Sequence, residues 1–313
     1  MDLDNKVKVG NGKKVSPEQL AEANRKIRRK FGRRRYLMSR YIPRYPIQVE
    51  REYKRVGRRY AKTFLQSVKK YSSELSEVNM DSADFHTDAM HSTRRRKAKQ
   101  VIDQASDDFY QTMLDVGVAE DVDRIAEMAK RNVVGQWGKA VDRSLGVKID
   151  RQSYLDKCTS VCSEWAEKSR AGLFGFFSGA RRRASEVLTG ALDIGKKIAD
   201  AVRDIYNDFI SGIAQLTQNA IGELNAMLSK FLQIDAGITK YQWRTMQDGR
   251  VRECHQTFDG KVFRWDDPPE IWYPTKHGVV YTGRLCHPGE DYNCRCIARP
   301  IFEIGRLHLE IVL

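Results

Sequence analysis

The run Asp235-Ala-Gly-Ile-Thr-Lys-Tyr-Gln-Trp-Arg-Thr245 marks a change in the hydrophobic period of this 313-residue chain. Its aromatic side chains alternate with polar ones, which is the two-residue period of a strand. Asp-Gly dipeptides at 248–249 and 259–260 favour tight turns. The sequence therefore predicts a small β-rich module, with further short strands at 262–263, 279–281 and 307–311.

Upstream of that run, apolar residues recur every three or four positions, which is the period of an amphipathic helix. The spacing covers 48–78, 117–145 and 150–235, and another helix opens at Arg94. The pair Ser16-Pro17 is a helix-start signal. The fold class expected is α+β, with mostly helical N-terminal and middle regions and a small β-rich C-terminal module.

These patterns, together with the distribution of charge, divide the chain into four segments. We predict a disordered lead-in over 1–15, a basic helical arm over 16–145, a helical region over 146–236 and the β-rich module over 237–313.

One apolar stretch, 171–179, is too short and too rich in glycine to cross a bilayer. We expect a buried turn between helices there, with a membrane-active loop as the alternative. Because no apolar run is long enough to span a membrane and the N-terminus does not resemble a secretion signal, no membrane partner is expected. The six cysteines are then expected to be reduced or bound to metal.

The positive charge of the chain is concentrated at one end. The formal net charge is +14, yet residues 1–100 hold 27 basic and 11 acidic residues, so the rest of the chain is almost neutral. This distribution excludes a uniformly basic coat and favours one electrostatic surface formed by one segment.

The basic segment interleaves arginine and lysine with Phe31, Tyr36, Tyr41 and Tyr45, a pattern suited to phosphate contact and base stacking without sequence reading. We predict that it binds double-stranded DNA non-specifically or an acidic protein surface. The alternative is a solvated helix face. The residues expected to make these contacts are Arg25, Lys26, Arg28, Arg29, Lys30, Arg33, Arg34, Arg35, Arg55, Arg58, Arg59, Arg94, Arg95 and Arg96.

A cluster of cysteine and histidine residues lies in the β-rich module. Thiolate and imidazole groups suit tetrahedral zinc, and a small domain gains folding free energy from such a site. Packing and hydrogen bonding without a metal, or a disulfide, are the alternatives. Adjacent residues on a strand point to opposite faces, so only one of Cys254 and His255 is expected to bind a metal. The candidate zinc ligands are Cys254, His255, Cys286, Cys294 and Cys296.

The same cluster allows a catalytic interpretation. Cys294 with His255 or His287 could form a nucleophile–base pair, with Asp259 orienting the base. The sequence lacks a local nucleophile signature and a His-Glu-x-x-His helix, so we expect that the protein is not an enzyme.

Several motifs of the module resemble a known family. They are the run from Gly237 to Thr245, then Asp248-Gly-Arg-Val-Arg-Glu-Cys-His255, Phe258-Asp-Gly260 and His287-Pro-Gly-Glu-Asp-Tyr-Asn-Cys-Arg-Cys296. Their order and spacing closely resemble the C-terminal signature of the phage Mu F-like minor head proteins, also called head morphogenesis proteins. The motif residues to which a structural role is carried over are Trp243, Asp248, Arg250, Arg252, Asp259, Gly260, Pro288, Gly289, Asn293 and Arg295.

The resemblance implies a structural protein of a tailed phage or prophage. It implies a place inside the capsid of the virion at the portal vertex, after assembly in the host cytoplasm. The implied partners are the portal protein and packaged DNA, with the major capsid and scaffold proteins as further candidates. An effector or toxin enzyme, a nuclease or a cysteine-dependent one, is the alternative function.

One branch of the family pairs a C-x₂-C with a His-Pro-x-Cys-Arg-Cys ending, which resembles a zinc knuckle. Here Arg252 and His255 stand at the C-x₂-C positions, and His287 is displaced by a longer loop. Two outcomes follow from the resemblance: Cys254 and Cys286 restore a four-ligand zinc site, or hydrogen bonds and ion pairs among the polar residues at 248–255 replace the metal.

Overall fold

The computed structural model describes residues 17–32, 34–80, 88–193 and 197–312, and the predicted lead-in over 1–15 lies outside them. The chain forms two compact units that do not follow the order of the sequence. The first unit contains residues 1–49, 126–165 and 219–313, and the second contains 50–125 and 166–218. The predicted segment boundaries stay a prediction.

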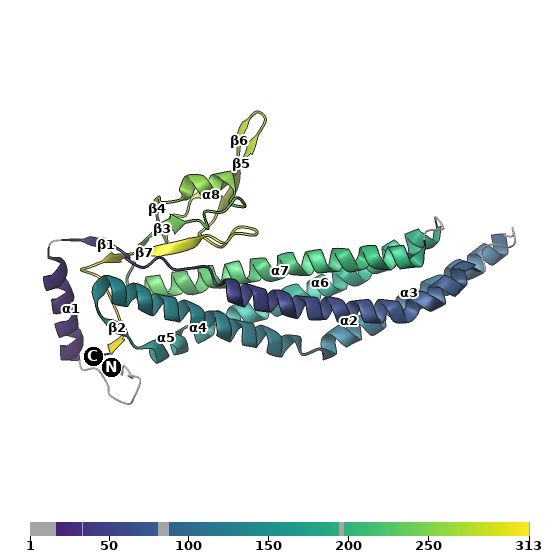
Figure 1. The fold of residues 1–313 in the computed structure, drawn as a ribbon, viewed down its shortest axis with the longest axis horizontal. Coiled ribbons are helices and arrows are strands. Elements are labelled where there is room, and N and C mark those ends of the chain that lie inside the picture. Colours follow the sequence, from purple (N-terminus) through teal and green to yellow (C-terminus); the bar gives the residue numbers. More distant parts are fainter. Residues whose placement is uncertain (1–16, 33, 81–87, 194–196, 313) are drawn as a thin grey trace, which may run out of the picture. The chain divides into compact units, whose positions relative to one another are not determined.

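The second unit is helical. It is built from parts of α2 (Ile47–Met80), α3 (Asp88–Asp115), α4 (Val118–Leu145), α6 (Thr159–Asp193) and α7 (Ile198–Asp235), shown in Figure 1. Aromatic rings fill its centre, where Phe64 stacks on Phe209 with centroids 4.6 Å apart and Phe109 packs against both. The apolar spacing that predicted these helices is therefore the spacing of their buried faces.

The apolar stretch at 171–179 lies within α6, so the predicted turn between helices is wrong. Phe177 is fully buried, and Phe176 lies where a side chain on Gly212 would stand. The stretch stays helical because tertiary packing outweighs the cost of about 1 kcal/mol for each glycine in a helix. Within the described residues, no helix is long and apolar enough to cross a membrane.

The first unit is organised around an antiparallel sheet in the order β1-β7-β3-β4. These strands are β1 (Tyr36–Met38), β7 (Ile297–Glu303), β3 (Lys240–Arg244) and β4 (Val262–Arg264). The alternation that predicted β3 reflects the burial of Tyr241 and Trp243 on one face, both with no exposed surface. Together with the helices, this sheet confirms the predicted α+β class.

The first unit also contains helices. They include α1 (Pro17–Phe31), α5 (Arg151–Lys157) and the C-terminal parts of α4 and α7. Trp137 of α4 packs against Phe302 of β7 with ring centroids 6.0 Å apart. The side-chain amide of Gln233, on α7, donates to the carbonyl of Ala298 at 3.0 Å.

Two further strand pairs complete the first unit. The pair β2 (Lys148–Ile149) and β8 (Ile311–Val312) is short, and β8 covers only the end of the predicted 307–311 strand. The pair β5 (Glu270–Thr275) and β6 (Gly278–Leu285) forms a hairpin, and Figure 1 shows it projecting away from the sheet.

Candidate metal centre

Three of the predicted ligands meet in the core of the first unit. His255 lies on the short helix α8 (Glu253–Phe258), and Cys294 and Cys296 lie in the loop that enters β7. Nδ1 of His255 is 3.7 Å from the sulfur of Cys294 and 3.7 Å from the sulfur of Cys296. All three residues are buried, and their ligand atoms lie within 4.8 Å of one another.

These distances fit a tetrahedral zinc ion. Zinc–sulfur bonds of about 2.3 Å and zinc–nitrogen bonds of about 2.0–2.1 Å place nitrogen and sulfur ligands about 3.6 Å apart. The backbone N–H groups of Gly289 and Cys296 each lie 3.4 Å from the sulfur of Cys294, where they favour a thiolate. A cavity of about 80 Å³ adjoins the three side chains and leaves room for a fourth ligand.

A buried carboxylate stands behind the histidine. Oδ2 of Asp291 lies 3.3 Å from Nε2 of His255. In the neutral imidazole the carboxylate favours a proton on Nε2, which leaves the Nδ1 lone pair facing the two sulfurs. Asp291 also forms ion pairs with Arg252 and Arg284. This arrangement is the usual second layer of a histidine metal ligand.

The protonation states of His255, Cys294 and Cys296 depend on one another. Although burial disfavours the imidazolium, the carboxylate of Asp291 and the thiol of Cys294 outweigh it and raise the pKa of His255 to about 9. The hydrogen bond from Cys296, together with His255, lowers the pKa of Cys294 well below its usual value. Without a metal the centre therefore holds a thiolate beside an imidazolium, and zinc would take the place of the Nδ1 proton of His255.

Helix α7 holds the cysteine loop in place. A Cβ atom on Gly222 would lie 2.9 Å from the carbonyl oxygen of Cys294 and 3.0 Å from that of Gly289. Gly289 itself has φ +98°. The side-chain oxygen of Asn219 accepts the backbone N–H of Asn293 at 2.6 Å. The absence of a side chain at Gly222 lets the loop approach the helix closely.

The other two predicted ligands, Cys254 and Cys286, do not join this group. Both are buried in the surrounding core, and a guanidinium nitrogen of Arg284 lies 3.8 Å from the sulfur of Cys286. Cys254 and His255 lie on helix α8 and not on a strand, so the premise of the predicted choice between them was wrong. The structure nevertheless brings only His255 of this pair into the group.

The family-motif residues surround the centre. Trp243 packs on His255, the carboxylate of Asp259 accepts the backbone N–H of Thr245 at 2.8 Å, and Arg250 pairs with Asp248. Asp259 thus does not orient a histidine, and Asp291 takes that position. Gly260 has φ +80°, Pro288 precedes the glycine of the cysteine loop, Asn293 has φ +54°, and Arg295 lies over the ring of Tyr45.

The predicted DNA-contact residues are divided between the two units. Arg33 and the side chains of Arg94 and Arg95 lie outside the described part of the chain. The first unit carries exposed Arg25, Lys26, Arg28, Arg29, Lys30, Arg34 and Arg35, and the second carries exposed Arg55, Arg58, Arg59 and Arg96.

Some residues of this basic set also have structural contacts. Arg59 forms an ion pair with the buried carboxylate of Asp121, and Arg55 pairs with Glu52. Of the interleaved aromatic residues, Phe31 and Tyr45 are buried and cannot stack on bases.

Sequence reasoning missed Asp291, Arg284 and Gly222. Asp291 lies inside the quoted His287–Cys296 motif, so its acidic side chain between a histidine and two cysteines was the available signal. Arg284 and Gly222 carry no such signal, because their roles depend on contacts across 7 and 72 residues of chain.

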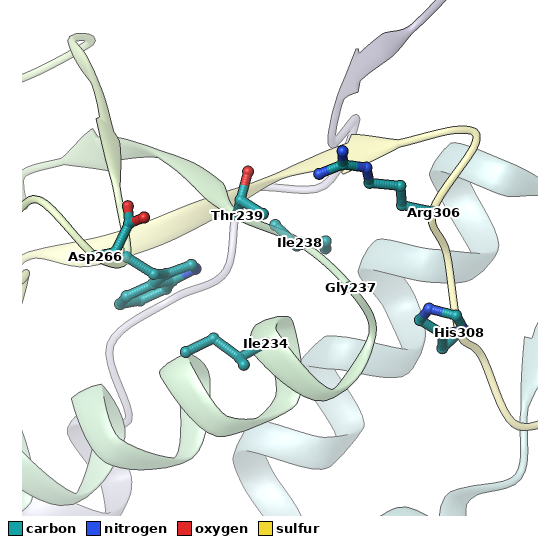
Figure 2. Close-up of a pocket in the computed structure, with 8 residues that line it drawn as sticks. Ile234, Gly237, Ile238, Thr239, Asp266, Arg306 and His308 are labelled. Atoms are coloured by element: carbon teal, nitrogen blue, oxygen red, sulfur yellow. The ribbon is translucent and has the colours of Figure 1, made fainter.

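A second cavity, of about 410 Å³, lies beside the end of α7, and none of the predicted site residues lines it. Ile234 and Ile238 line it, and Figure 2 shows them between Asp266 on one side and Arg306 and His308 on the other.

Acid is expected to destabilise the fold through His287. Burial lowers the pKa of this histidine to about 4, and its Nδ1 lies 3.0 Å from the hydroxyl of Tyr241. In the unfolded chain a histidine has a pKa of about 6.5. The unfolded state therefore binds the proton first, so this stabilisation is complete above about pH 6.5 and falls by about 3 kcal/mol towards pH 4.

Urea denaturation between pH 7 and pH 4.5 tests this expectation. His287→Asn should flatten the decline, and the matched control His277→Asn, at an exposed position of the hairpin turn, should leave it unchanged. Equal slopes for the native chain and His287→Asn would contradict the assignment.

Comparison with known proteins supports the resemblance. Residues 186–299 match the family described as phage Mu protein F like protein, which bears out the resemblance over that range. An uncharacterized protein of Haemophilus influenzae is 29% identical over 162 residues, which are 50% of this chain and 33% of that protein. The chain thus matches about a third of the length of this relative. No solved structure matches the chain.

Proposed function

We propose that the protein is a head morphogenesis protein of a tailed phage or prophage, present in the virion as a minor capsid component. The match of residues 186–299 to the phage Mu F-like family carries this proposal. The motifs that resemble the family also form one structural centre, built from β3, α8 and the cysteine loop. We propose a structural role and no enzymatic one.

The proposed location is inside the capsid at the portal vertex, after assembly in the host cytoplasm. The test is to purify particles of the parent phage and to probe them for the protein. Co-expression of the full chain with the portal protein of the same genome should give a complex that survives size-exclusion chromatography. The major capsid and scaffold proteins serve as comparison partners. Absence of the protein from purified particles would refute the proposal.

We propose that the exposed basic residues of α1 contact the phosphates of packaged DNA. Arg25, Lys26 and Arg29 are exposed on this helix, whereas Ile27 and Phe31 anchor its other face in the core. Tyr36, which follows the helix, is 39% exposed and lies under Lys240. Binding of this kind depends on counterion release, so it is steeply salt-dependent and insensitive to base sequence.

The DNA contact can be tested with the full chain and duplexes of unrelated sequence. Replacing Arg25, Lys26 and Arg29 by glutamine should reduce the slope of log affinity against log salt by about 2–3, because each phosphate contact contributes about 0.9. The matched control replaces three exposed basic residues outside the predicted set, Arg182, Arg183 and Lys197, and should leave the slope unchanged. An equal change in both variants would indicate only a general charge effect.

We also propose zinc as the bound cofactor, held by His255, Cys294 and Cys296. The purified chain is expected to contain about one zinc per molecule after metal-supplemented expression. Cys296→Ser should lower the zinc content at least tenfold, whereas Cys158→Ser, at a buried cysteine outside the group, should retain it. Less than about 0.2 zinc per chain would count against the metal.

The same experiment separates the metal from the cysteine-dependent enzyme. Cys294, His255 and Asp291 also have the order of a nucleophile, a base and an orienting acid. A zinc-bound thiolate is protected from iodoacetamide until a chelator is added. Rapid labelling of Cys294 in protein that has never contained metal, with no change on chelation, would favour the catalytic alternative.

A further inference from the structure

The β5–β6 hairpin exposes apolar side chains on both of its faces. Val279 and Tyr281 share one face and are 50% and 64% exposed, while Val280, on the other face, is 52% exposed. Near the base, Leu285 is 61% exposed. A two-stranded hairpin is only marginally stable in water on its own, and contiguous exposed apolar surface marks an interaction site.

The two edges of this hairpin differ. Thr275 pairs with Gly278 around a two-residue turn, and Pro274 pairs with Val279. Because proline has no N–H, the Pro274–Val279 pair is a non-hydrogen-bonded one, whose backbone groups point outward. The free edge of β5 therefore presents a proline, which blocks the addition of a strand. The free edge of β6 presents the N–H of Val279 and, two residues on, that of Tyr281.

A positively charged side chain lies at each end of the free edge of β6, which we call the open edge. Lys276 lies in the turn, and Arg284 lies near the base, where it shares the single negative charge of Asp291 with Arg252. The carboxylate of Glu270 accepts the backbone N–H of Gly283 at 2.7 Å and belongs to β5.

These charges argue against a second copy of the chain. In an antiparallel pair of two β6 strands centred on Val280, the arginine of each copy would lie opposite the lysine of the other. Like charges opposite one another destabilise such a pair. An acidic partner would instead be favoured at both ends.

We propose that the open edge of β6 is a docking site for an apolar β-strand of another protein, with acidic residues at both ends of that strand. The partner strand would accept and donate backbone hydrogen bonds at Val279 and Tyr281, and its side chains would cover the two apolar faces. A nucleic acid would leave these faces exposed. The inference rests on the hairpin alone and does not depend on the proposed function.

The probe is a fluorescent peptide of alternating valine and threonine, flanked at both ends by glutamate pairs. A second peptide carries lysine pairs instead. Anisotropy titrations with the full chain should show at least about tenfold tighter binding of the glutamate-flanked peptide. Lys276→Glu should reduce this preference at least threefold.

The backbone contact is tested by Val279→Pro, which removes an outward N–H without removing a hydrogen bond within the hairpin. It should weaken binding of the glutamate-flanked peptide at least about tenfold. The matched control Val279→Thr keeps the N–H and should weaken binding less than threefold. Hydrogen exchange verifies that the hairpin stays formed in both variants. If Val279→Pro unfolds the hairpin, the Lys276→Glu result decides the proposal.

Three results would overturn the proposal. The first is equal affinity of the chain for the two peptides. The second is full affinity of the Val279→Pro variant for the glutamate-flanked peptide while its hairpin is intact. The third is a dimer in sedimentation experiments that the Val279→Pro substitution dissociates. The last result would assign the edge to a second copy of the chain.

Discussion

Gly237→Ala is expected to cost about 3 kcal/mol or more of the free energy of unfolding. Gly237 ends α7 with φ +77°, and its N–H bonds to the carbonyl of Ile234 in a helix C-cap. A Cβ atom there would overlap the carbonyl oxygen of Arg306, which is backbone and cannot rotate away. The variant therefore combines an unfavourable φ with a displacement of the 306–308 loop.

Gly260→Ala is the matched control for this prediction. Gly260 has φ +80°, almost the same angle, but a Cβ atom there meets nothing within 4 Å. Only the conformational cost of about 1 kcal/mol then remains. Urea denaturation of both variants at pH 7 measures the difference, and equal losses would show that the loop yields without cost.

The second large effect is expected for Asp291→Asn. The asparagine keeps the shape of the side chain but removes the charge that Arg252, Arg284 and His255 share. Breaking a buried ion pair typically costs 3–5 kcal/mol. Because the two arginine side chains are about one third exposed and can regain water, we expect a loss near the lower end, about 3 kcal/mol.

The matched control is Asp266→Asn. The Asp266 carboxylate is bound by Arg264, but its side chain is 66% exposed. A surface pair of this kind contributes little, so the loss should stay within about 0.5 kcal/mol. The comparison uses chemical denaturation of metal-free protein, so that altered zinc affinity does not enter. A loss at Asp291 no larger than that at Asp266 would refute the role assigned to the buried carboxylate.

The sequence predicted the class of the fold because its hydrophobic periods match the helices and strands of the structure. The alternation around Trp243 became β3, and the three- and four-residue spacing became α2, α4, α6 and α7. It misplaced the 171–179 stretch because glycine lowers local helix propensity, whereas the packing of Phe177 is a tertiary effect. Strand β1 was missed because three residues beside an arginine run carry no detectable period.

The candidate site was predicted in its chemistry but not in its geometry. Cysteine and histidine content indicated a metal, yet nothing local distinguishes Cys294 and Cys296 from Cys254 and Cys286. The difference arises from α8, which turns His255 toward the first pair. The carboxylate behind the histidine depends on how the loop folds back, which spacing alone does not reveal.

The pairing of β1 with β7 has a consequence for folding during synthesis on the ribosome. Tyr36 lies opposite Glu303, so this strand pair cannot form until Glu303 has left the ribosome. At 5–20 residues per second, the basic N-terminal segment waits roughly 10–50 s for its partner strand. During that interval no partner strand fixes the arginines beside β1, so the segment can meet anionic partners in conformations that the folded protein does not allow.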